Sequence, residues 1–148
     1  MNINKPRISQ TYLIKNFKSK MISDGWECLY SDLPGGLRSG IGNKKLINTF
    51  FEQNMDKIPD LIFYKENNII ICEVDHRLEE DYLKKFNLYQ IYMKKIISFF
   101  STIMMKKIEN CKFYFIYKIK NTNNFLKKDY KKKHIKLFFF NDDKFLCD

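Results

Sequence analysis

The sequence predicts one α/β domain spanning residues 1–148, with a mixed central sheet flanked by helices on both faces. Its 148 residues are the usual size of one domain, and 45% of them are hydrophobic, enough for a substantial core. Short apolar runs alternate along the chain with segments in which apolar residues recur every three or four positions. Such alternation of strands and helices is typical of a sheet covered by helices.

The N-terminal part predicts a helix over residues 9–21 and a strand over residues 26–30. Ser9 is a candidate N-cap, and the apolar stripe of this helix is formed by Tyr12, Leu13, Phe17 and Met21. Residues 31–43 hold four of the five glycines in the chain and predict a loop. A second helix is expected from residue 44 to about residue 54, with Asn43 as its cap.

The middle of the chain predicts a β-hairpin, with strands over residues 59–65 and 69–75 and a tight turn at residues 66–68. Residues 69–72 are apolar at every position, which favours a strand buried on both faces. Cys72, in this run, and Cys111 are expected in the core.

The C-terminal half predicts one long amphipathic helix, about residues 78–104, because its apolar residues follow a helical spacing. A strand over 111–119, a short basic helix over 125–133 and a last strand over 135–140 follow. No internal repeat or separate linker is evident.

The predicted hairpin is expected to bring three carboxylates to one end of the sheet. Asp60 begins the first strand, and the turn places Glu73 opposite it. Glu73 and Asp75 are two residues apart on one strand, so their side chains share a face. Clustered carboxylates repel one another and favour a proton or a cation. With oxygen ligands alone, the expected cation is Mg²⁺, with Mn²⁺ as a substitute.

The sequence Pro59-Asp60, the hairpin and Glu73-Val74-Asp75 together resemble the PD-(D/E)xK nuclease superfamily, which has the restriction-endonuclease-like fold. The resemblance covers the motif and the order of elements from about residue 9 to residue 119. It implies a restriction-endonuclease-like core and a metal-dependent nuclease in which Asp60 and Glu73 are metal ligands.

Asp75 departs from the family pattern, which usually has a lysine there to orient or activate the attacking water. We expect Asp75 to take part in catalysis, either by accepting the proton of the water or by binding the metal. In the alternative, Lys84 or Lys85 supplies the missing cation from the following helix, and Asp75 only caps the turn into it.

Weaker candidates surround this motif. Glu52, on the preceding helix, is either a further metal ligand, as the family often has there, or a solvent-facing glutamate. Gln90 is either a catalytic residue, since related nucleases often place Gln or Lys on this helix, or an amide on the helix flank. The candidates for nucleic-acid binding are Arg38, Lys44, Lys45 and Arg77. Arg38 would meet a phosphate beside a helix N-terminus, or lies in a surface loop.

The net charge of +10 is unevenly distributed along the chain. Residues 76–136 hold sixteen Lys and Arg against five acids, whereas residues 1–75 are nearly balanced. Such a basic half is typical of a protein that binds a polyanion, either nucleic acid or an acidic membrane surface, although a lysine-rich solvated surface has the same composition. No segment is long and apolar enough to span a bilayer, and no signal peptide is evident.

These observations predict a Mg²⁺-dependent endonuclease that hydrolyses DNA, specifically a small type II restriction endonuclease. A cytoplasmic homodimer acting on double-stranded DNA is expected, because cutting both strands requires two sites. Two alternatives remain open. One is another nuclease of the superfamily, such as a junction resolvase, a transposon-end nuclease or an RNA endonuclease. The other is a nucleic-acid-binding module that has lost catalysis.

Overall fold

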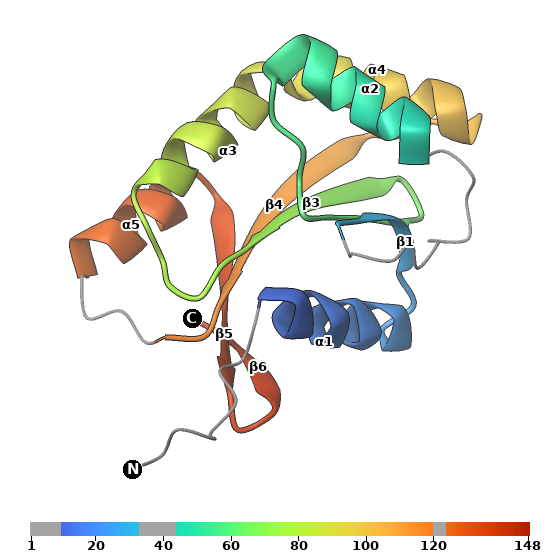
Figure 1. The fold of residues 1–148 in the computed structure, drawn as a ribbon. Coiled ribbons are helices and arrows are strands. Elements are labelled where there is room, and N and C mark those ends of the chain that lie inside the picture. Colours follow the sequence, from blue (N-terminus) through green and yellow to red (C-terminus); the bar gives the residue numbers. More distant parts are fainter. Residues whose placement is uncertain (1–9, 33–43, 120–123) are drawn as a thin grey trace.

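A computed structural model describes residues 10–32, 44–119 and 124–148, which form an α/β protein with a six-stranded mixed sheet and five helices (Figure 1). The helices are α1 (Gln10–Ser23), α2 (Lys44–Met55), α3 (Asp81–Ile91), α4 (Met93–Met104) and α5 (Asn124–Lys132). The strands are β1 (Glu27–Ser31), β2 (Leu61–Lys65), β3 (Asn68–Val74), β4 (Asn110–Tyr117), β5 (Ile135–Asn141) and β6 (Lys144–Cys147). The predicted α/β class is confirmed.

The strands lie across the sheet in the order of the chain, from β1 to β6. The pairs β1–β2, β2–β3 and β5–β6 are antiparallel, while β3, β4 and β5 run parallel. The predicted hairpin is present as β2 and β3, in which Leu61 pairs with Cys72 and Lys65 with Asn68. β3 is central and is buried from Ile69 to Val74, so the prediction of a strand buried on both faces is confirmed.

One face of the sheet is covered by α1 (Figure 1). Leu13 and Phe17 of this helix belong to a buried cluster with Phe63 of β2 and with Ile70 and Cys72 of β3. The ring of Phe17 packs edge-on against that of Phe63, with 6.1 Å between the centroids. Alternate residues of the hairpin strands therefore anchor α1, as the two-residue period of a strand requires.

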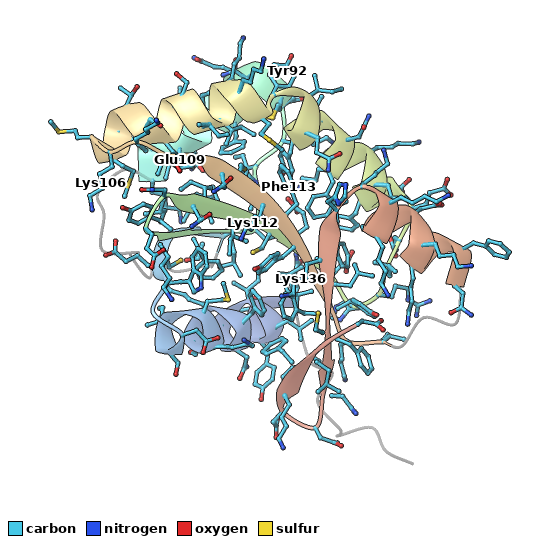
Figure 2. The ribbon with its side chains drawn as sticks, turned by 180° about the vertical axis from the view of Figure 1, so that it is seen from behind. Tyr92, Lys106, Glu109, Lys112, Phe113 and Lys136 are labelled. Carbon is cyan, nitrogen blue, oxygen red and sulfur yellow. The ribbon has the colours of Figure 1, made fainter. Side chains whose placement is uncertain are left out.

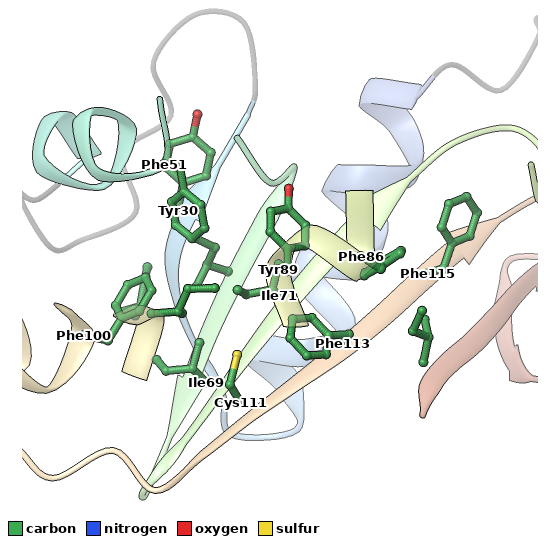
Figure 3. Packing of buried hydrophobic residues seen from close by; sticks show 14 of the residues in the cluster. Tyr30, Phe51, Ile69, Ile71, Phe86, Tyr89, Phe100, Cys111, Phe113 and Phe115 are labelled. Carbon is green, nitrogen blue, oxygen red and sulfur yellow. The ribbon is translucent and has the colours of Figure 1, made fainter. Parts of the chain in front are cut away.

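The opposite face is covered by α2, α3 and α4 (Figures 1 and 3). Here Ile69 and Ile71 of β3 pack in a second cluster with Phe86 and Tyr89 of α3 and Phe100 of α4. The predicted arrangement, with helices on both faces of the sheet, is confirmed.

The prediction of one continuous helix over residues 78–104 is wrong. The helix is interrupted at Tyr92, whose backbone has φ −92° and ψ 12°. This residue separates α3 from α4 (Figure 2). Neither proline nor glycine stands at the break, and the apolar stripe runs through it. Helical periodicity alone therefore gave no indication of the change in direction.

The short strand β6 was not predicted. It follows a two-residue turn in which Asp142 and Asp143 both have positive φ, 48° and 60°. Such a turn suits a tight hairpin, and aspartate tolerates this conformation better than most residues. The strand is short, at an edge and largely exposed, so its sequence lacks a clear alternation.

The four cysteines are all free, and Cys72 and Cys111 are buried as predicted. In the part of the chain that the structure describes, no helix is long and apolar enough to cross a membrane.

Candidate active site

Asp60 and Glu73 lie at the same end of the β2–β3 hairpin. Asp60 directly precedes β2 and its backbone N–H donates to the carbonyl of Cys72, which places it opposite Glu73 as the hairpin register predicts. Both side chains are buried, with exposed fractions of 7% for Asp60 and 0% for Glu73. Burial of a carboxylate is costly without partners, so the contacts of these two groups determine what they can do.

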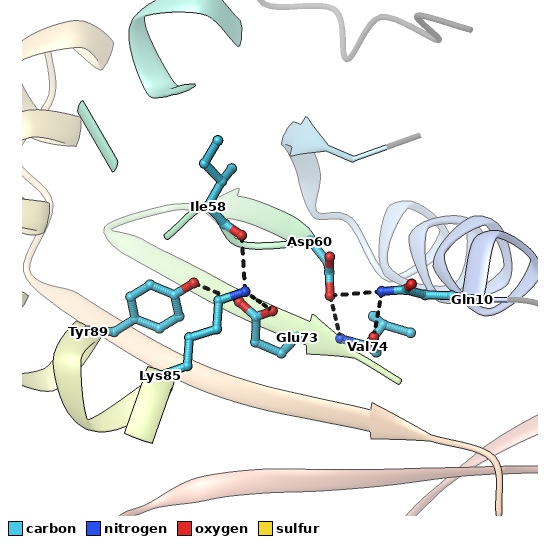
Figure 4. Close-up of polar contacts among 7 residues, drawn as sticks. All are labelled: Gln10, Ile58, Asp60, Glu73, Val74, Lys85 and Tyr89. Carbon is cyan, nitrogen blue, oxygen red and sulfur yellow. Dashed lines mark hydrogen bonds and ion pairs between the residues drawn. The ribbon is translucent and has the colours of Figure 1, made fainter. Parts of the chain in front are cut away.

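Asp60 is held from β3 and from α1. Its Oδ2 accepts a 2.8 Å hydrogen bond from the backbone N–H of Val74 and lies 3.5 Å from Nε2 of Gln10 (Figure 4). The same Nε2 donates to the carbonyl oxygen of Val74 at 2.8 Å. Gln10 therefore ties the first residue of α1 to the end of β3 beside Asp60. This contact could not be found from sequence, because 64 residues separate the two partners.

Glu73 is held from α3. Its Oε1 lies 2.7 Å from Nζ of Lys85, and its Oε2 accepts a 2.7 Å hydrogen bond from the hydroxyl of Tyr89 (Figure 4). Nζ of Lys85 also donates to the carbonyl of Ile58 at 3.2 Å. Lys85 and Tyr89 are four residues apart in the helix and so share a face. Both oxygens of Glu73 are thus engaged by donors from one helix.

Burial raises the proton affinity of both carboxyl groups. Burial raises the pKa of Glu73 well above its usual range, and the charge of Asp60 adds to this, while Lys85 and Tyr89 act in the opposite direction. Burial also raises the pKa of Asp60, partly offset by the hydrogen bond from Val74 and the charge of Lys85. Two acids with one ammonium group leave an excess negative charge when both are ionised. The pair therefore favours a proton or an additional cation.

Asp75 does not join this pair, so the prediction of three converging carboxylates is wrong. In the described ranges, no three His, Cys, Asp or Glu residues form a group that could hold a metal ion. β3 ends at Val74, and Oδ1 of Asp75 accepts the backbone N–H of His76 at 2.7 Å. The Asp75 carboxylate also neighbours Tyr82, where burial and then this carboxylate raise the pKa of the phenol. Of the two lysines in the alternative, Lys85 is the one that contacts Glu73. The contact of Asp75 is to the next backbone N–H and does not cap α3, whose N-cap residue is Glu80.

The other catalytic and metal candidates lie elsewhere. Lys84 is exposed and makes no ion pair with Glu73. The amide of Gln90 donates to the carbonyl of Lys133 at 2.6 Å, which links α3 to the segment before β5. Glu52 is exposed on α2, where it helps to raise the pKa of Tyr30 to about 12, after burial, Asp32 and Asp60.

The structure shows no side-chain contact between the described members of the predicted nucleic-acid-binding set. Arg38 lies outside the described residues. Nζ of Lys44 is 5.5 Å from the centroid of the Tyr30 ring, while Lys45 and Arg77 are exposed. Arg77 forms an isolated β-bridge with Ile119 beyond the end of β3.

A cavity of about 720 Å³ opens beside the carboxylate pair. Lys85 lines it and, through its ion pair, connects it to Glu73. Two further lysines, three acids, Tyr82 and Leu88 complete the lining. The volume is in the range of ligand-binding pockets.

Carboxylates are the ligand type that Mg²⁺ and Mn²⁺ prefer, and both oxygens of Glu73 already accept hydrogen bonds from Lys85 and Tyr89. Mg²⁺ is commonly held by one or two carboxylates together with water and phosphate oxygens, and Asp60 and Glu73 would supply two carboxylates that share one ammonium, that of Lys85. Neither His nor Cys is needed for such a site.

Comparison with known protein families, curated proteins and solved structures finds no significant match for this chain.

Proposed function

We propose that the protein is a Mg²⁺-dependent endonuclease with a restriction-endonuclease-like fold that hydrolyses phosphodiester bonds in DNA. The observation that carries the proposal is the buried Asp60–Glu73 pair with Nζ of Lys85 2.7 Å from Glu73. This set provides two acids and one ammonium, the groups that the resemblance to the PD-(D/E)xK nucleases implies. Here the lysine comes from α3 instead of position 75.

The proposed roles follow from the contacts. Asp60 and Glu73 would hold the metal, which when bound lowers the pKa of a water molecule and offsets charge on the phosphate. Tyr89 fixes the orientation of the Glu73 carboxylate through its hydroxyl. The ammonium of Lys85 faces the cavity and would donate a hydrogen bond to the attacking water or to a phosphate oxygen.

A small type II restriction endonuclease is the specific form proposed. The charge of residues 76–136 supports a polyanionic substrate, and a homodimer would supply a site for each strand of duplex DNA.

One observation favours a second candidate, a nucleic-acid-binding module without catalysis. Both oxygens of Glu73 already accept hydrogen bonds from Lys85 and Tyr89, so a metal would have to share or displace one of them.

A panel of substrates tests the proposal. Plasmid DNA, a synthetic four-way junction and a structured RNA are each incubated with the protein in Mg²⁺ and in EDTA, and products are resolved on gels. We expect discrete DNA fragments in Mg²⁺ and none in EDTA. Cleavage of the junction or RNA alone would support another nuclease of the superfamily. Binding of DNA without cleavage of any substrate would support the binding module.

A further inference from the structure

The cavity beside Lys85 has a distinct arrangement of charge. Its cations are Lys57, Lys84 and Lys85, which come from the segment before β2 and from the second turn of α3. Its acids are Asp75, Glu79 and Asp81, which come from the segment after β3 and the start of α3. Lys57 therefore lies in the same segment as Asp60, and Lys84 is the neighbour of Lys85 in α3.

The backbone of Lys57 lies close to the carboxylate pair because of its place in the chain. The next residue, Ile58, accepts a hydrogen bond from Lys85 through its carbonyl, and Asp60 follows two residues later. Lys57 is exposed and makes no ion pair within the described part of the chain. Its ammonium group is thus available to a ligand at the mouth of the cavity.

Lys84 is likewise a lysine whose ammonium group has no described ion-pair partner. It is exposed, lines the cavity and makes no ion pair with any described residue. Its neighbour Lys85 is engaged by Glu73, so the two adjacent lysines have different environments. Three acids also line the cavity, but neither Lys57 nor Lys84 is paired with any described acid, so both ammonium groups are free to bind an anionic ligand.

We propose that Lys57 and Lys84 bind the phosphate groups that neighbour the scissile phosphate, so that the cavity takes a polynucleotide strand and not a single nucleotide. This inference rests on the proposed function. A strand with its scissile phosphate at Lys85 presents further phosphates along its backbone, and each needs a counterion. Asp75, Glu79 and Asp81 repel phosphate, so Lys57 and Lys84 are the lining groups that can serve as these counterions.

The salt dependence of DNA binding tests the assignment. Each phosphate contact made by a lysine on duplex DNA contributes about 0.9 to the slope of log binding constant against log salt. We compare the wild type with Lys57→Gln, Lys84→Gln and the double variant, using a fluorescent synthetic duplex in EDTA over a KCl series. EDTA prevents metal-dependent cleavage and removes divalent competitors. The matched control is Lys144→Gln, which removes one exposed lysine from β6.

We expect each single variant to lower the magnitude of the slope by about 0.9 and the double variant by about 1.8. Lys144→Gln should keep the slope of the wild type, and melting temperatures should show that all variants fold. A double variant with the slope of Lys144→Gln would overturn the phosphate assignment. If in that case the wild type still cleaves DNA in Mg²⁺, the proposed function stands and only the assignment of Lys57 and Lys84 falls. A wild type that neither binds DNA in EDTA nor cleaves it in Mg²⁺ would overturn both.

Discussion

Lys85 provides positive charge beside the carboxylate pair and acts to lower the pKa of both acids. Its ammonium is 2.7 Å from Glu73 and 3.2 Å from the carbonyl of Ile58, so one side chain joins α3 to the end of β3 and to the segment before β2. Its side chain is 19% exposed, which leaves it accessible from the cavity. It therefore stabilises a buried negative charge and also lines the cavity.

Replacement of Lys85 separates its role from that of its neighbour. Lys85→Met should lower the cleavage rate by about 10²-fold or more, since it removes the cation that would contact the water or phosphate. Lys84→Met should retain the cleavage rate at saturating DNA and weaken binding instead. Rates measured over a DNA concentration series distinguish the two effects. Equal loss of rate in both variants would contradict the assignment of Lys85.

Asp75 is expected to act through the backbone. Its Oδ1 accepts the N–H of His76, and an asparagine oxygen at the same place accepts that hydrogen bond equally well. Asp75→Asn should therefore keep most of the activity and the same Mg²⁺ requirement. A large loss of activity in this variant, measured over a Mg²⁺ series, would instead mean that the charge of the Asp75 carboxylate is needed for catalysis.

The raised pKa values of Asp60 and Glu73 predict how stability depends on pH. A carboxyl whose pKa is raised in the folded state binds a proton that the unfolded state, with a pKa of about 4, has already released. Folding stability therefore rises as pH falls through the folded-state pKa values towards about pH 4, and this contribution is lost at higher pH.

Asp60→Asn tests this expectation. The variant removes one charge of the pair, and the asparagine oxygen can still accept the N–H of Val74. Its melting temperature should exceed that of the wild type at about pH 8, where both acids are most ionised, and the difference should shrink at about pH 5. Thermal unfolding at the two pH values measures it. A difference independent of pH would mean that repulsion between the acids is not its cause.

At the scale of elements, the hairpin explains why part of the site was predictable. Apolar runs around the turn at Glu66 and Asn67 specified β2 and β3, and their register then placed Asp60 opposite Glu73. The ion pair of Glu73 with Lys85 was only one of two lysine alternatives, because the orientation of α3 on the sheet decides which lysine faces inward. Spacing does place Lys85 on the face of Tyr89, which belongs to the apolar stripe, but it does not show how close that face comes to Glu73.

The contacts of Gln10 and Tyr89 were not predicted for related reasons. Tyr89 belongs to the apolar stripe of α3, which suggested a core residue, and its hydroxyl finds Glu73 only once α3 packs on β3. The break at Tyr92 was hidden by the continuous apolar stripe. Each missed feature depends on tertiary packing and not on local composition.

The basic helix α5 is expected to hold the segment that carries Glu79. The hydroxyl of Tyr130, a fully buried residue of α5, donates to the backbone carbonyl of Glu79 at 2.5 Å. Tyr130→Phe removes this hydrogen bond and leaves a carbonyl without its donor, which should cost about 1 kcal/mol. Chemical denaturation measures the loss. Tyr92→Phe is a suitable control, because the Tyr92 hydroxyl has no hydrogen bond to any described residue. Equal stability of the Tyr130 variant and the wild type would contradict this role.

At the scale of the whole molecule, the proposed restriction enzyme requires two copies of the site for the two strands of DNA. Sedimentation should give a particle with twice the 18.0 kDa mass of one chain, at least when DNA is bound. A monomer that nevertheless cuts both strands in a single binding event would contradict the dimeric form of the proposal. The carboxylate pair itself would be unaffected by that result.

The central claim is that Asp60 and Glu73 form a metal-dependent hydrolytic site. The most direct test is the rate of plasmid cleavage over a Mg²⁺ series for the wild type, Asp60→Ala, Glu73→Ala and Glu52→Ala. Glu52→Ala is the matched control, because it removes an exposed acid from α2. The account predicts cleavage by the wild type and by Glu52→Ala in Mg²⁺, and none by folded Asp60→Ala or Glu73→Ala. Cleavage by either of these two variants at the rate of the wild type, or full activity of the wild type in EDTA, would contradict it.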